Sequence, residues 1–97
     1  MSNPYAQASN LAKARRKARA YDARLILKPS TRKGKKLDAF LKDRPDKKIA
    51  SFGAVGYTDY ILSGDKKRRA AYRKRHAKDL TYAGKFTAGK LAYYILW

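Results

Sequence analysis

Three short apolar runs separated by turn residues decide the fold of this chain: Arg24-Leu-Ile-Leu-Lys28, Leu37-Asp-Ala-Phe-Leu-Lys42 and Lys48-Ile-Ala-Ser-Phe52. Each run is too short for a stable helix, and the second and third alternate with a period near two, which favours strands. The segments 29–34 and 43–46 between them have the composition of turns. The sequence therefore predicts a three-stranded antiparallel meander, which persists only when something covers one face.

Two helical segments downstream are expected to cover this sheet. A helix is expected near residues 65–79, and Tyr72, His76 and Leu80 at its end lie on one stripe at four-residue spacing. Residues 91–97 are expected to form a helical turn that is almost wholly apolar. The predicted fold class is α+β, a small three-stranded antiparallel meander covered by two helical segments, with a basic N-terminal arm. The expected core residues are Leu25, Leu27, Phe40, Ile49, Phe52, Tyr72, Leu80 and Leu91.

The basic arm is expected to span residues 1–23, and the single domain then spans residues 24–97. The spacing over residues 9–25 predicts a helix, but its apolar stripe is thin because two of its positions are Ala14 and Ala18. Little apolar area is then left to hold the helix on a core. We therefore expect the arm to be ordered mainly by what it binds.

The charge of the chain points to a polyanionic partner. The 97 residues include 25 Lys or Arg against 7 acidic residues, all of them Asp, which gives a net charge of +18. Such charge on a body of radius about 13 Å repels itself, so the protein is expected to lie against nucleic acid or an acidic surface. The candidate polyanion-binding residues form two clusters, Lys13, Arg15, Arg16, Lys17 and Arg19 in the arm and Lys66, Lys67, Arg68, Arg69, Arg73, Lys74 and Arg75 downstream.

Catalysis and cofactor binding are not expected. The chain has one His, no Cys and no Glu, so the sequence predicts no enzyme, no metal site, no cofactor and no small-molecule substrate. His76 is interpreted as a side chain at the edge of the core. Residues 84–91 share the Gly-four-Gly-Lys spacing of a phosphate-binding loop, but Leu91 stands where a Ser or Thr should hold magnesium, so we interpret the match as chance.

Targeting signals are also not expected. The longest apolar stretches fall well short of the roughly 18 residues that a membrane-spanning helix needs. The first ten residues lack the charged flank and apolar run of a secretory signal.

The apolar C-terminal segment is expected to serve both the core and an interface. Tyr93, Tyr94 and Trp97 bring large aromatic area to the end of the sequence. Because a segment that is apolar all round cannot hide every face against one thin sheet, part of it should meet another protein. We predict that Trp97 and at least one of Tyr93 and Tyr94 contact a neighbouring chain, where aromatic side chains act as anchors.

Four blocks in the second half of the chain carry a family resemblance. They are Phe52-Gly-Ala-x-Gly-Tyr-x-Asp-Tyr60, Asp65-x-x-Arg-Arg-x-x-Tyr-x-x-Arg-His76, Thr87-Ala-Gly89 and Ile95-Leu-Trp97. Their order resembles a family of small proteins encoded by large nucleocytoplasmic double-stranded DNA viruses of algae and protists. The resemblance covers about half of the chain. The chain departs from the family at Ser51 and Ser63, where members commonly have His.

This resemblance implies a virion structural component. Such a protein would be a minor capsid protein that bridges or cements neighbouring capsid proteins, including the major capsid protein, on the inner side of an icosahedral shell. It would reside in the host cell interior during assembly and then in the virion. The alternative is a sequence-independent nucleic-acid-binding protein, either a virion DNA-packaging protein or a ribosomal protein, because both assemblies reward positive charge.

Overall fold

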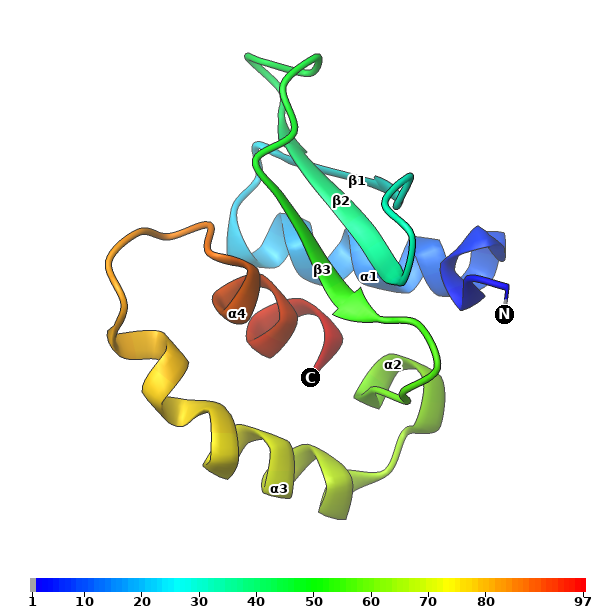
Figure 1. Ribbon diagram of the computed structural model, residues 1–97, viewed down its shortest axis with the longest axis vertical. Helices are drawn as coiled ribbons and strands as arrows, with labels where there is room; N and C mark the ends of the chain where they lie inside the picture. The colour runs from blue at the N-terminus through cyan, green and yellow to red at the C-terminus, as the bar shows by residue number, and fades with distance from the viewer. Residues whose placement is uncertain (1) are drawn as a thin grey trace.

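The computed structural model describes residues 2–97 and confirms the α+β fold class (Figure 1). Three strands form one antiparallel sheet in the order β1-β2-β3. In chain order the elements are η1 (Pro4–Ala6), α1 (Ala8–Tyr21), β1 (Leu25–Pro29), β2 (Lys35–Leu41), β3 (Ala50–Ala54), α2 (Tyr60–Ser63), α3 (Lys66–His76), η2 (Ala77–Thr81), α4 (Ala88–Leu91) and the π-helical turn η3 (Ala92–Leu96). Within residues 2–97, no helix has both the length and the apolar character that crossing a bilayer requires.

The register of the sheet explains which strand residues enter the core. Leu25 of β1 lies opposite Leu41 of β2, and Leu27 lies opposite Ala39. On the other side of β2, Leu37 lies opposite Phe52 of β3. Because side chains alternate across a strand, these residues share one face of the sheet. That face packs against α1 and the C-terminal segment (Figure 1).

The segment predicted as a separate arm is instead part of the folded body. In α1, Ala14 and Ala18 are fully buried, and this helix packs against β1 and η3. The small side chains that make the apolar stripe thin also let the helix backbone approach the sheet closely. Arg15 strengthens the contact, since its Nε and Nη2 donate to the backbone oxygen of Leu27 at 3.1 and 3.0 Å.

The C-terminal segment covers the sheet as expected, but the helix over residues 65–79 does not. Helix α4 and turn η3 lie between the sheet and α3, which runs along the far side of them (Figure 1). Leu91, Ile95 and Leu96 are fully buried, whereas α3 contains no buried residue. The reason is composition, because apart from Tyr72 the residues of α3 are Ala, His or cationic.

Half of the expected core residues are buried, and the other half are only partly buried. Four expected core residues are buried, namely Leu25, Leu27, Phe52 and Leu91. The other four, Phe40, Ile49, Tyr72 and Leu80, are half-buried. Phe40 lies on the opposite face of β2 from Ala39, where the Lys28 ammonium sits 5.0 Å from its ring centroid. The sequence pattern identified the strand but not which of its two faces is covered.

A buried ion pair joins the N-terminal segment, the sheet and α2. The Nζ of Lys36 in β2 donates to Oδ2 of Asp59 at 2.8 Å, and both side chains are almost completely inaccessible to solvent. Tyr5 donates its hydroxyl to the same carboxylate oxygen at 2.8 Å, and Leu62 N–H donates to Oδ1 at 2.9 Å. Burial raises the pKa of the Tyr5 hydroxyl, and the charge of Asp59 raises it further. Tyr5 therefore stays a neutral donor.

Gly53 has a structural reason to be glycine. Its φ angle is +79°, a conformation that other residues rarely adopt. A Cβ atom built at this position would lie 2.8 Å from Cδ1 of Leu96 and 3.1 Å from Cβ of Lys36. The absent side chain thus allows η3 to pack against the end of β3 beside the buried ion pair.

Asp38 organises the turn between β1 and β2. Burial opposes its charge, but hydrogen bonds from the hydroxyls of Ser30 and Ser51 and from Thr31 N–H, together with Lys48, outweigh burial and lower the pKa of Asp38 to about 2. A carboxylate that accepts this many hydrogen bonds is strongly favoured in its charged form.

We predict that Lys36→Met destabilises the fold by about 3–5 kcal/mol, because it leaves the charge of Asp59 buried without its cation. Chemical denaturation measures this free energy of unfolding. The matched control is Lys35→Met, because the adjacent side chain has no acidic partner within 4 Å among residues 2–97. Equal loss of stability in both variants would contradict the structural importance of the pair.

We predict that Asp38 contributes to stability at neutral pH and loses this contribution in acid. Its pKa in the folded chain is about 2 against an ordinary value of 3.8, so the contribution, about 2 kcal/mol, is present above pH 4 and disappears as the pH falls through about 2. The stability difference between the natural chain and Asp38→Asn should therefore shrink over this range. Urea denaturation at a series of pH values measures it. A difference that stays constant from pH 5 to about pH 2 would contradict the assignment.

Candidate functional site

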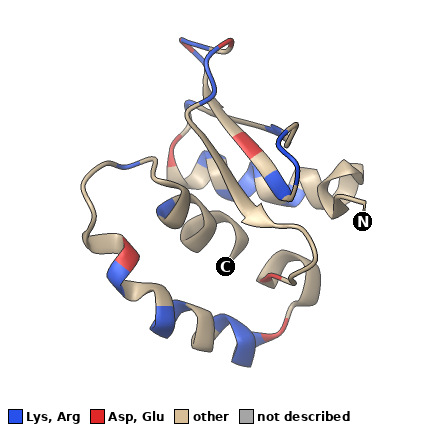
Figure 2. Ribbon diagram, viewed as in Figure 1, with Lys and Arg blue, Asp and Glu red and all other residues tan. Residues whose placement is uncertain are grey.

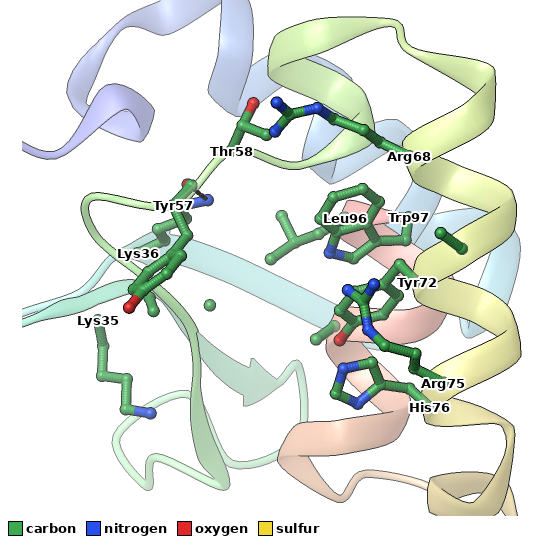
Figure 3. A pocket seen from close by; sticks show the side chains of 14 residues that line it. Lys35, Lys36, Tyr57, Thr58, Arg68, Tyr72, Arg75, His76, Leu96 and Trp97 are labelled. Atoms are coloured by element: carbon green, nitrogen blue, oxygen red, sulfur yellow. Dashed lines mark hydrogen bonds between the residues drawn. The ribbon is translucent and has the colours of Figure 1, made fainter.

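A cleft of about 580 Å³ opens between the sheet and α3. One wall comes from the end of β3 and the connection to α2, the opposite wall comes from α3, and Leu96 and Trp97 lie between the two walls (Figure 3). Asp59 and Asp65 fix the walls locally because they cap α2 and α3. The cleft therefore lies where the first two of the sequence blocks quoted above face each other.

Three stacked rings form the α3 side of the cleft. The ring of Tyr72 lies parallel to that of Trp97, with 4.4 Å between ring centroids and 7° between planes. His76 stacks on Tyr72 at 4.1 Å, and its Nδ1 lies 3.0 Å from Oδ2 of Asp79. The side chain of His76 remains 38% exposed, so the stack ends in an accessible imidazole. This position agrees with the expectation of a His at the edge of the core.

Tyr57 stands on the opposite wall (Figure 3). Its side chain is exposed, with 75% of the residue accessible to solvent. Its backbone oxygen accepts a hydrogen bond of 2.6 Å from Lys36 Nζ, which ties this wall to the buried ion pair. The Tyr57 ring is therefore exposed to solvent, while its backbone is held in place by the buried Lys36.

Cationic side chains surround these rings. Arg68 and Arg75 extend from α3 toward the cleft, and Lys35 lies on the sheet side (Figure 3). Arg68 lies 3.6 Å from Asp65, an exposed pair that neutralises it only weakly. Within residues 2–97, Lys35 and Arg75 have no acidic partner within 4 Å. The site can therefore attract an anion and contact a planar ring.

Two predicted polyanion-binding residues of α3 are directed toward the protein instead. Arg69 Nε and Arg73 Nη2 donate to the backbone oxygen of Trp97 at 2.8 and 3.2 Å. The guanidinium of Arg69 also lies 4.7 Å from the ring centroid of Tyr60. These two residues hold α3 against the end of η3. The sequence alone does not distinguish this structural role from a role in binding a polyanion.

The cationic residues of α1 divide in the same way. Arg15 is engaged by the sheet, and Lys17 is half-buried with its ammonium 5.8 Å from the ring centroid of Tyr60. Burial lowers the pKa of Lys17, and the nearby charges of Arg69 and Arg73 lower it further. The remaining predicted polyanion-binding residues are exposed, namely Lys13, Arg16, Arg19, Lys66, Lys67, Arg68, Lys74 and Arg75.

Sequence reasoning missed both Lys35 and Tyr57 as site residues. Lys35 follows the turn at Gly34 and lies outside the two clusters of basic residues. Tyr57 belongs to the block of residues 52–60, but the sequence assigns it no role. The one available signal in the sequence is the succession Gly56-Tyr57, because Gly favours a turn. In the structure Gly56 has a φ of +100°, and Tyr57 after it is exposed. Further cations that sequence reasoning did not single out lie at the hairpin turns of the sheet (Figure 2).

The C-terminal aromatic residues, which the sequence predicts to contact a neighbouring chain, differ in their exposure. Trp97 is only 9% exposed and belongs to the core of its own chain. Tyr93 is half-buried with the Arg73 guanidinium 5.2 Å from its ring centroid. Tyr94 is 39% exposed and stacks on Tyr21 of α1 at 4.9 Å, so it has the most accessible ring of the three.

The segment that shares the spacing of a phosphate-binding loop closes on itself. The Nζ of Lys90 donates to the backbone oxygens of Tyr82 and Gly84, each at 2.6 Å, so this ammonium stabilises the loop from within. Among residues 2–97, no three His, Cys, Asp or Glu side chains are grouped so that they could hold a metal ion.

The architecture and the cleft together define a small basic α+β protein with an aromatic and cationic site. The profile of the Family of unknown function (DUF5754) matches residues 25–76. Because this match covers more than half of the chain, the protein belongs to that family. The matched region runs from β1 to the end of α3 and so contains both walls of the cleft. No curated protein and no solved structure matches the chain.

We predict that Trp97→Ala destabilises the free protein by about 3–5 kcal/mol, since it removes a buried ring that stacks on Tyr72. Thermal and chemical denaturation of the isolated chain measure the effect. Tyr94→Ala is the matched control and should cost less because its ring is partly exposed. A Trp97→Ala variant as stable as the natural chain would show that the indole does not support the fold.

Proposed function

We propose that this protein is a structural component of a virion, a small basic minor capsid protein that cements neighbouring capsid proteins on the inner side of an icosahedral shell. The resemblance of the quoted sequence blocks to proteins of large double-stranded DNA viruses supports the assignment to a virion. The blocks also build a scaffold, since Phe52 enters the core, Asp59 and Asp65 cap helices, and Tyr72 packs on Trp97.

The observation that carries this proposal is the distribution of unneutralised charge over a small folded body. Residues 2–97 include every Lys and Arg of the chain, and five of these 25 cations form an ion pair with an Asp. Most of the exposed ones lie on α1, on α3 and at the hairpin turns, which point in different directions (Figure 2). A small body with cations on separate sides can contact more than one acidic neighbour at once, as a cementing protein must.

A second proposal is sequence-independent binding of nucleic acid, in a virion DNA-packaging protein or a ribosomal protein. The cleft favours it, because an exposed Tyr and a stacked His lie beside guanidinium groups. Side chains of these kinds bind bases by their faces and phosphates by their charge, without reading sequence.

We predict that the protein co-purifies with virions in fixed proportion to the major capsid protein and stays with them after detergent treatment. Quantitative mass spectrometry of purified particles measures this ratio. Opening the particles and digesting their nucleic acid then separates the two proposals, because a cementing protein stays with the shell fragments and a packaging protein leaves with the digested genome. Recovery only in host ribosome fractions would overturn the assignment to a virion.

A further inference from the structure

We propose that the cleft between the sheet and α3 binds one unpaired nucleotide of a single-stranded nucleic acid. The base lies against the rings of Tyr57 and His76, and the adjoining phosphates contact Arg68, Arg75 and Lys35. This inference rests on the second proposed function, nucleic-acid binding, and names the site and the strand form that it uses.

The size of the cleft suits this ligand. Its volume of about 580 Å³ falls within the roughly 300–1,000 Å³ that small-molecule and cofactor sites enclose. A base with its sugar and phosphate fills a space of this order, whereas a duplex cannot enter it. In a duplex each base also has both of its faces covered by its neighbours, so only an unpaired base can offer a face to Tyr57 or His76.

The rings of the cleft are placed for stacking rather than for the core. Tyr57 is 75% exposed although it follows a turn that is held by the buried Lys36. His76 is the accessible end of a stack that continues through Tyr72 to Trp97. The His76 ring is thus held by Tyr72, so it loses little side-chain freedom when a base packs on it. The Tyr57 ring projects from a backbone that Lys36 holds in place.

The cations around the cleft favour a ligand that has both a negative charge and an aromatic ring. Lys35 and Arg75 have no acidic partner within 4 Å in the described chain, and the partner of Arg68 is exposed. An acidic peptide would satisfy these cations but would leave both aromatic faces in water. A nucleotide satisfies both, since phosphates pair with guanidinium groups and the base covers a ring.

The test measures the affinity of the full chain for a short single-stranded oligonucleotide by the fluorescence of Trp97, which is the one Trp of the chain and lines the cleft. Tyr57→Ala should weaken binding about fivefold or more, the loss expected for one base that no longer stacks. The matched control is Tyr82→Ala, which removes another exposed Tyr, 64% accessible, outside the cleft. It should leave the affinity unchanged.

A second pair of variants tests the charge of the rim. Arg75→Gln removes a cation from the cleft, and Arg16→Gln removes one from the exposed side of α1, so general attraction falls equally in both. Only Arg75→Gln should also lose the quenching of Trp97 by the oligonucleotide. Melting temperatures of all four variants should match that of the natural chain, because each altered side chain is exposed.

Three ligands separate failure of this inference from failure of nucleic-acid binding itself. A strand of the same length without bases, a duplex and a free mononucleotide are compared with the oligonucleotide, each at several salt concentrations. Weak binding of the abasic strand supports the inference. If all strands bind with equal affinity that falls steeply with salt, and Tyr57→Ala binds as well as Tyr82→Ala, the inference about the cleft is overturned. General nucleic-acid binding is then left intact. If no ligand binds at low salt, both the inference about the cleft and the proposal of nucleic-acid binding are overturned. If the mononucleotide binds more tightly than the strand, the inference that the ligand is a polymer is overturned.

Discussion

The buried contact between Lys36 and Asp59 is the constraint on which the rest of this structure depends. Removing two charges from water costs several kcal/mol for each ion, and their attraction offsets this only when additional hydrogen bonds satisfy both groups. Here those bonds come from distant parts of the chain, because Tyr5 donates to the carboxylate and the backbone oxygen of Tyr57 accepts from the ammonium. Satisfying one ion pair therefore fixes the N-terminal segment, the central strand and the connection to α2 relative to one another.

The cleft follows from this arrangement. With the sheet side held by the ion pair and Gly53 leaving room for Leu96, the C-terminal turn η3 occupies the space beside β3. Helix α3 has no apolar stripe with which to close over the sheet, so it is held at a distance by Tyr72 on Trp97 and by two Arg side chains on the backbone oxygen of Trp97. A cationic helix that cannot enter the core thereby becomes one wall of a site.

The sequence was sufficient for the strands, because short apolar runs with a period of two and turn residues between them depend on local pattern alone. It was insufficient where the answer depends on the partner surface. Ala14 and Ala18 read as weak core formers, yet their small size is what lets α1 approach the sheet. Lys36 could not be recognised as buried, since Lys is almost never fully buried without a partner and its partner is 23 residues away. For the same reason the clusters of cations predicted attraction to a polyanion but not which members face the protein.

The division of the cations bears on how the two proposed functions relate. Arg15, Arg69 and Arg73 donate hydrogen bonds to backbone oxygens of their own chain. Arg68 and Arg75, in contrast, remain accessible beside the cleft. The contacts of the inward group are partly buried and so are screened less by salt, whereas the outward group is exposed and can act on a nearby anion. A cementing protein on the inner side of a shell faces capsid proteins on one side and packaged nucleic acid on the other. A body with cations on separate sides, together with the site proposed for an unpaired base, would have the surfaces that both contacts require.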